Sequence, residues 1–337
     1  MTIRSKLSIG PVGIAASATL AVGALGALPI QSAFADSHPS PSASVLNGTL
    51  VIEGTNGPDA ITIGVAADPS RLQVAFGPGA AAAQSFDRAT FRTIVVSLRT
   101  GNDTFSVDPH AQFSDRPLTV FGGRGDDTIR GSDGNDVLFG GRGDDNIDGA
   151  RGADTEILGR GDDTALWLPG EGSDTIDGGR GFDVLGFFGN GLNEKFALVA
   201  NGSHAILTRD LGTIVMDTDR VESVDLSTLG GSDTVNVGDL TGTSLRADNI
   251  DLSSAGTADG QIDVVSVDGT DNVDHVAVDA ARATVQVNGL HTRTTVSGND
   301  THDQLHVNTG AGDDSVAVSA AAAAAIAVSV DLGADQS

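Results

Sequence analysis

Aspartate recurs in phase between Gly122 and Gly186, and this spacing is the strongest chemical signal in the sequence. Divided into nonapeptides, the chain reads GGRGDDTIR, GSDGNDVLF, GGRGDDNID, GARGADTEI, LGRGDDTAL, then, after the insertion Trp167-Leu168, PGEGSDTID and GGRGFDVLG. All seven units have glycine at position four and aspartate at position six. The repeated carboxylate predicts a series of ligands for hard cations. The sixth-position residues are Asp127, Asp136, Asp145, Asp154, Asp163, Asp174 and Asp183.

The other positions of the unit must turn the chain and then return it to a core. Glycine accepts positive φ without a Cβ penalty, so positions one to six can form a tight turn that aims carbonyl oxygens at a cation. Carboxylate and carbonyl oxygens suit Ca²⁺ far better than Zn²⁺, which prefers His and Cys. Positions seven to nine form a short strand whose middle side chain points inward. These expected inward residues are Ile129, Leu138, Ile147, Ile176 and Leu185.

The repeat resembles the calcium-binding nonapeptide of the RTX (repeats-in-toxin) proteins, G-G-x-G-x-D-x-U-x, in which U is a large apolar residue. The resemblance implies a right-handed parallel β-roll in which two nonapeptides complete one turn and every second repeat stacks at the same edge, sharing several Ca²⁺ ions. The stretches PGEGSDTIDGG and DGQIDVVSVDGTDN also resemble secreted bacterial RTX-repeat proteins without an evident enzyme domain. The implied edges are Asp127, Asp145 and Asp163 on one side and Asp136, Asp154 and Asp174 on the other.

Three departures from the repeat predict local weakness. Glu156 and Ala165 occupy positions where a large apolar residue belongs. We therefore expect the roll to loosen or bend beside Asp154 and Asp163. No recognisable repeat follows Asp183 directly, so this residue is expected to lack a stacking partner on its C-terminal side.

The remainder of the chain predicts an all-β fold with β-rich flanking regions and degenerate solenoid repeats. Short β-type runs alternate with Gly, Asn and Asp, and FALVANGSHAILTRD predicts a hairpin around Asn201-Gly202. Only Ala320–Ala325 has helical composition. Whether the loose repeats bind calcium stays open at this point. Those echoes are GTNGPDAIT from Gly54, TGNDTF from Thr100, GGSDTV from Gly230, GTDNVDHV from Gly269, GNDTHDQL from Gly298 and GAGDDSV from Gly310.

The sequence predicts six segments. Residues 1–35 are expected to be an export signal, with Arg4 and Lys6 before an apolar run and Ala33-Phe34-Ala35 at its end. This signal predicts a secreted or cell-surface protein. The further boundaries are 36–47 for a Pro/Ser linker, 48–112 for an N-terminal β region, 113–186 for the roll, 187–229 for a hairpin or meander and 230–337 for a C-terminal β region.

The acidic composition of the chain restricts the classes of partner that it can bind. The chain has 40 Asp but only five Glu, a net charge of −26 and no cysteine. Nothing forms the basic stripe that nucleic acid requires, and no membrane-active segment follows the export signal. We expect no nucleic-acid partner and no membrane insertion. A cell-surface or polysaccharide partner is compatible with the sequence.

Competing interpretations have less support. Arg-Gly-Asp at Arg124, Arg142 and Arg160 follows from the repeat and does not require an adhesion receptor; with Arg180, these arginines are expected to screen the acidic residues. The chain lacks H-E-x-x-H and G-x-S-x-G. Trp167 is expected to cap the roll rather than bind carbohydrate. We therefore expect a non-enzymatic calcium-binding protein with a structural or surface-interaction role; the alternative is a β-solenoid enzyme acting on extracellular polysaccharide, or a hydrolase-associated RTX protein.

Overall fold

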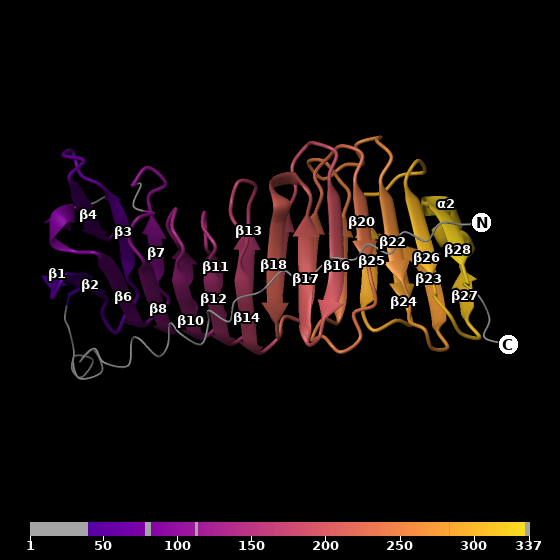
Figure 1. Cartoon of the computed structure of the whole chain (residues 1–337), viewed down its shortest axis with the longest axis horizontal. Coiled ribbons are helices and arrows are strands. Elements are labelled where there is room, and N and C mark those ends of the chain that lie inside the picture. The colour runs from indigo at the N-terminus through magenta and orange to yellow at the C-terminus, as the bar shows by residue number, and fades with distance from the viewer. Residues whose placement is uncertain (1–39, 78–81, 112–113, 283, 334–337) are drawn as a thin grey trace. The chain divides into compact units, whose positions relative to one another are not determined.

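The computed structural model describes residues 40–77, 82–111, 114–282 and 284–333, and these residues form two long sheets (Figure 1). The predicted export signal lies outside the described residues. In order of neighbouring strands, sheet 1 contains β1 (Ser42–Leu46), β2 (Thr49–Glu53), β6 (Thr93–Thr100), β8 (Leu118–Arg124), β10 (Val137–Arg142), β12 (Thr155–Arg160), β14 (Thr175–Arg180), β18 (Ile214–Asp219), β17 (His204–Arg209), β16 (Lys195–Asn201), β20 (Thr234–Val237), β22 (Val264–Asp268), β26 (Gln304–Asn308) and β28 (Ala327–Asp331).

Sheet 2 takes the strands that alternate with these along the chain. Its order is β27 (Ser315–Val318), β23 (His275–Ala281), β24 (Thr284–Asn288), β25 (Arg293–Ser297), β21 (Ala247–Asp251), β19 (Ser223–Ser227), β15 (Val184–Phe188), β13 (Thr164–Trp167), β11 (Asn146–Asp148), β9 (Thr128–Arg130), β7 (Thr104–Val107), β3 (Ala60–Val65), β4 (Arg71–Phe76) and β5 (Ala82–Asp87). Short helices η3 (Arg88–Thr90), η4 (Leu211–Thr213) and α2 (Ala320–Ala325) join some of the strands. The segment expected to be a linker contains β1.

The repeats form a parallel β-roll because each nonapeptide supplies one short strand to one sheet and the next nonapeptide supplies the other. Leu138 pairs with Val120 and with Glu156, which lie 18 residues before and after it. Ile147 pairs in the same way with Ile129 and Ala165. Two nonapeptides therefore complete one turn, as the resemblance implied.

The roll continues without a break through the positions where we expected it to loosen. Glu156 pairs with Ile176 and Ala165 with Leu185, in parallel registers of 20 residues. The two additional residues of the insertion lengthen the turn that follows β13 and leave both ladders intact. The expectation of a loosened or bent roll at this point is wrong.

Trp167, the first residue of that insertion, ends β13 and lies in the core. Its side chain is buried, and its ring stacks on Phe187 with centroids 4.1 Å apart and planes within 2°. Its Nε1–H donates to the carbonyl oxygen of Gly172 at 2.7 Å. The polar edge of the indole thus fastens the enlarged turn while the ring fills the core. This burial excludes an exposed carbohydrate platform.

The core between the sheets is a single hydrophobic cluster built from alternate residues of the strands. Side chains of successive strand residues point to opposite faces, so alternate positions are buried. The inward residues predicted from the repeats, Ile129, Leu138, Ile147, Ile176 and Leu185, are each at most 1% exposed. Five of the seven repeats contribute one large apolar residue at this position, and Glu156 and Ala165 occupy it in the other two, which makes the core thin.

The flanking regions continue the same two sheets. β6 pairs in parallel with β8, and β7 with β9, so the N-terminal β region leads directly into the repeats. Further along, β16, β17 and β18 form an antiparallel meander between β14 and β20. β16 and β17 confirm the predicted hairpin, whose turn contains Gly202 at φ 68°. None of the helices in the described residues has the length and hydropathy of a membrane span.

The fold predicts that a methyl group at Gly141 is much more harmful than one at Gly186. Gly141 has φ 121°, and a Cβ there would lie 2.4 Å from the carbonyl oxygen of Gly123 in the preceding turn; at Gly186 the nearest atom is 3.5 Å away. We expect Gly141→Ala to lower the free energy of unfolding by at least about 1–2 kcal/mol, the cost of left-handed backbone for a residue with a Cβ. Thermal unfolding of the calcium-loaded protein measures this. Equal stability of Gly141→Ala and Gly186→Ala would contradict the backbone geometry.

Candidate metal centre

The sixth-position aspartates line the two edges of the roll, where the chain passes between the sheets. We call the turns from sheet 1 to sheet 2 edge 1 and the turns in the other direction edge 2. At edge 1, the backbone N–H of Asp127 donates to Oδ1 of Asp145 at 2.8 Å, and that of Asp145 to Oδ1 of Asp163 at 2.7 Å. At edge 2, the N–H of Asp136 donates to Oδ1 of Asp154 at 2.7 Å. The predicted division of the aspartates between two edges is confirmed.

The ladder of N–H to carboxylate bonds also includes the residues that were expected to be weak. Asp154 donates to Oδ1 of Asp174 at 2.8 Å, and Asp163 donates to Oδ1 of Asp183 at 3.0 Å. Asp183 has a partner on its C-terminal side, because its N–H donates to Oε2 of Glu222 at 2.9 Å. The expectation that Asp183 lacks such a partner is wrong. A glutamate from a segment with no recognisable repeat takes the place of the next aspartate.

The same bond recurs in the flanking regions. At edge 1 the N–H of Asp59 donates to Asp103 at 2.7 Å, and that of Asp103 to Asp127 at 2.9 Å. The C-terminal region repeats it with distances of 2.7–2.9 Å. Its donor and acceptor pairs are Glu194 with Asp233, Asp233 with Asp263, Asp263 with Asp303 and Asp274 with Asp314. Each loose echo found in the sequence thus supplies one ladder residue, whereas Glu194, Glu222 and Asp263 lay outside those echoes.

Position one is glycine in five of the seven close repeats, and there the carboxylate of the same unit occupies the space of a Cβ; Leu158 and Pro169 take this position in the other two. A Cβ on Gly122 would lie 2.6 Å from Oδ2 of Asp127, and one on Gly140 would lie 2.5 Å from Oδ2 of Asp145. The flanking pair Gly269 and Asp274 has the same geometry at 2.5 Å. This first glycine and the sixth-position acid therefore form one steric unit in both the close and the loose repeats.

Burial makes the ladder electrostatically unfavourable when the aspartates are charged. All seven sixth-position aspartates are at most 4% exposed. Desolvation is the main cause that raises their pKa, and neighbouring carboxylates add to it. The pKa rises to about 6 for Asp127 and Asp163, to about 7 for Asp145, and to about 9 for Asp154. The pKa values of Asp136, Asp174 and Asp183 also rise to about 7.

The second carboxylate oxygen of eight ladder residues is buried without a hydrogen-bond partner. This holds for Oδ2 of Asp103, Asp127, Asp145, Asp154, Asp163, Asp183, Asp233 and Asp314. Buried polar atoms without partners are costly, so their recurrence at one position needs a compensating charge. In the described residues, no three side chains of His, Cys, Asp or Glu converge on one metal position. A Ca²⁺ ion fits this oxygen-only donor set if backbone carbonyls of the glycine turns complete the coordination.

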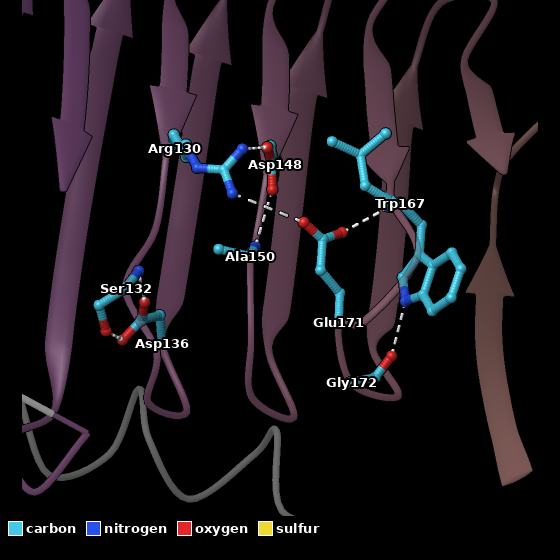
Figure 2. Close-up of polar contacts among 9 residues, drawn as sticks. Arg130, Ser132, Asp136, Asp148, Ala150, Trp167, Glu171 and Gly172 are labelled. Atoms are coloured by element: carbon cyan, nitrogen blue, oxygen red, sulfur yellow. Dashed lines mark hydrogen bonds and ion pairs between the residues drawn. The ribbon is translucent and has the colours of Figure 1, made fainter. Parts of the chain in front are cut away.

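Edge 2 carries an additional group of buried acids around the insertion (Figure 2). Arg130 forms ion pairs with Asp148 and, at 3.7 Å, with Glu171. Glu171 also accepts from the N–H of Leu168 at 2.5 Å, a bond within the enlarged turn itself. Burial raises the pKa of Glu171 to about 8. One cation thus holds two carboxylates at the place where the repeat is longest.

Glu156 is the costliest member of this acidic group. Its side chain is 2% exposed in the row of Leu138 and Ile176, and its Oε2 has no hydrogen-bond partner. Burial raises its pKa well above the ordinary value, and the charges of Asp174, Asp154 and Asp148 raise it further. Sequence reasoning recognised the unusual residue, but the fold keeps it in the core instead of opening around it.

We predict that Glu156→Leu stabilises the protein when calcium is removed. The substitution places an apolar side chain between Leu138 and Ile176, and full burial of such a side chain contributes about 1.5–3 kcal/mol. Thermal unfolding in chelator measures the change, with Glu156→Gln as the matched neutral control and a smaller gain expected for it. An unchanged or lower melting temperature for Glu156→Leu would show that the glutamate contributes favourable contacts.

The raised pKa values also predict an unusual pH dependence without calcium. A carboxyl whose pKa is raised on folding binds its proton more tightly in the folded state, so protonation stabilises the fold. This stability is fully present below the unfolded value of about 4 and is lost as the pH rises through the folded values, about 6 for Asp127 and about 9 for Asp154. Chelated protein should therefore retain more β-sheet CD signal at pH 5 than at pH 8. The opposite order would contradict the buried ladder.

The comparison with protein-family models agrees with this geometry. The model of the RTX calcium-binding nonapeptide repeat matches four copies, in residues 121–156 and 170–185. The search of curated proteins gave no match. Among solved structures, the extracellular lipase LipA from Serratia marcescens is similar at 14% identity with a TM-score of 0.18; the alignment covers 63% of this chain and 43% of the lipase. In-phase sequence, two-repeat turns and the family match lead to one assignment: residues 121–156 and 170–185 are RTX calcium-binding nonapeptide repeats.

Proposed function

We propose that this chain is an extracellular protein whose roll folds when Ca²⁺ binds at its two edges. The observation that carries the proposal is the recurrence of buried sixth-position carboxylates whose Oδ2 atoms have no hydrogen-bond partner. The candidate ligands are the aspartates predicted from the sequence, from Asp127 to Asp183. The ladder residues of the flanking turns are candidates by the same geometry.

Calcium would supply positive charge that balances the buried carboxylates, whose repulsion the thin apolar core is too small to offset. Each turn brings buried carboxylates close to those of the preceding turn, and their mutual repulsion opposes folding. A divalent cation held by oxygen ligands neutralises that repulsion and satisfies the second oxygen. Binding energy then becomes folding energy, because the ligands come together only in the folded chain. The absence of cysteine means that no disulfide can take over this role.

The proposed extracellular location of the folded protein follows from the calcium affinity expected of such sites. Extracellular calcium modules typically bind at about 10⁻⁴–10⁻³ M. The chain would therefore stay without metal in the cytosol and fold after export. The predicted signal at residues 1–35 supports export and belongs to the same proposal.

We assign the folded protein a structural or surface-interaction role without catalysis. The alternative is an enzyme that acts on extracellular polysaccharide, or a part of a hydrolase-associated protein. A screen of the calcium-loaded protein against proteins, esters and acidic polysaccharides separates these classes. Reproducible turnover of any of these substrates would overturn the non-enzymatic assignment.

Calcium titration followed by far-UV CD and calorimetry tests the proposal. We expect β-sheet signal and protease resistance to appear together with calcium binding. Asp145→Asn keeps an oxygen that can accept the N–H bond but removes the charge, so it should raise the calcium midpoint about tenfold, as ligand charge controls affinity. Asp144→Asn, at the neighbouring exposed position, is the matched control and should change the midpoint little. Identical CD and protease resistance with calcium and with chelator would refute calcium-dependent folding.

A further inference from the structure

Position three of the nonapeptide builds a row of arginines along one edge of sheet 1. The row consists of Arg124, Arg142, Arg160 and Arg180, which end the consecutive strands β8, β10, β12 and β14. These residues are direct register partners, each paired with the next. All four side chains are exposed. Neighbouring strands lie about 4.8 Å apart, so the row repeats a positive charge at that interval.

The row is confined to edge 1. The same position of the repeats at edge 2 carries Asp133, Arg151 and Glu171. The turn therefore tolerates acids at position three, and its geometry does not require arginine. An arginine in each of the four close repeats of edge 1, in a chain with a net charge of −26, calls for another explanation.

The acids beside the row are already held by the backbone. The N–H of Asp144 donates to Oδ1 of Asp126 at 3.0 Å, that of Asp162 to Oδ1 of Asp144 at 2.9 Å, and that of Phe182 to Oδ1 of Asp162 at 2.8 Å. No ion pair joins these acids to the arginine row in the described part of the chain. The expectation that the arginines screen the acidic ladder thus finds no direct contact to support it. The guanidinium groups remain available to an external anion.

The surface next to the row suits an extended ligand. Gly123, Gly141 and Gly159 precede the arginines in register, and a Cβ at Gly141 or Gly159 would collide with the previous turn. This strip is therefore free of side chains. Two residues before these glycines, Phe121 and Phe139 stack with ring centroids 4.9 Å apart, and Ile157 continues this apolar row on β12. On β14 the same register position holds Asp177, so the apolar row runs beside the first three arginines only.

We propose that this arginine row binds a linear acidic polysaccharide with a carboxylate or sulfate on each sugar. A guanidinium presents a planar fork that matches such anions in bidentate geometry, and the row supplies one fork for each strand spacing. Single exposed ion pairs are weak, but a polymer engages all four at once. Duplex DNA fits less well, because it carries one charge per about 1.7 Å of its axis, which does not match the strand spacing of about 4.8 Å. The proposal rests on the proposed function, since the row exists only in the folded roll.

Binding of size-defined oligogalacturonates, too short to gel with calcium, tests the proposal on the calcium-loaded full chain. Neutral malto-oligosaccharides of equal length and a single-stranded DNA oligonucleotide are the comparison ligands. The test variant combines Arg142→Gln with Arg160→Gln; a second variant combines Arg142→Lys with Arg160→Lys. Arg151→Gln at edge 2 is the matched control. Calorimetry gives the affinity, and CD verifies that each variant folds at the same calcium concentration.

We expect oligogalacturonate to bind, and the double glutamine variant to bind at least about tenfold more weakly, since hydrogen bonds to charged groups contribute strongly. The double lysine variant should fall between, and Arg151→Gln should bind like the unmodified chain. Affinity should decrease as salt increases. No measurable binding, equal binding by the double glutamine variant, or equal or tighter binding of DNA would overturn the proposal.

Sedimentation of the same samples tests whether a second copy of this chain, instead of a polysaccharide, occupies the arginine row. A dimer that the double glutamine substitution abolishes would assign the arginine row to a second copy of this chain and overturn the polysaccharide. Failure of the calcium proposal gives a different result, because the chain would then stay folded in chelator by CD. The comparison between the glutamine variant and the unmodified chain would still be readable in that case.

Discussion

The backbone N–H that donates to the carboxylate of the next turn is the interaction on which this structure depends. It places one acid per repeat inside the edge of a β-roll, where water cannot solvate its charge. Each glycine at position one makes room for that acid, and each N–H fixes one of its oxygens. The same geometry that aligns the turns therefore accumulates negative charge along both edges. Ordering and repulsion arise from one set of contacts, and the proposed Ca²⁺ would relieve the repulsion while leaving these contacts in place.

The periodic part of the fold could be predicted from the sequence, because seven units with the same residue types at the same positions adopt the same local structure. Inward residues such as Leu138 follow from the phase of the repeat, whereas the two-repeat turn and the assignment of Asp127 and Asp136 to different edges follow from the resemblance to RTX repeats. The loose echoes gave the flanking aspartates for the same reason. Their role became clear only when the sheets placed them in register with the close repeats.

Features that depend on long-range pairing were not accessible in this way. Glu222 continues the ladder beyond Asp183 from a segment 39 residues away, across an inserted meander that hides the spacing. Glu156 was recognised as unfavourable, but its local cost does not reveal that parallel pairing on both sides keeps the strand in place. The insertion after β13 likewise looked disruptive, whereas a buried indole and a lengthened turn accommodate it. In each of these three places, pairing between strands far apart in the sequence determines the structure, and the local sequence pattern predicted something else.

The meander β16–β17–β18 has a consequence for the order in which the chain can assemble. A regular solenoid grows by adding each new turn to the previous one. Here β18 joins β14, while β16, made earlier, lies two strands further out and waits for β20. A chain that emerges N-terminus first can therefore extend its roll continuously only as far as β15. Beyond that point the three strands of the meander form their own hairpins and dock together, and β23, β24 and β25 repeat this arrangement in sheet 2 between β21 and β27.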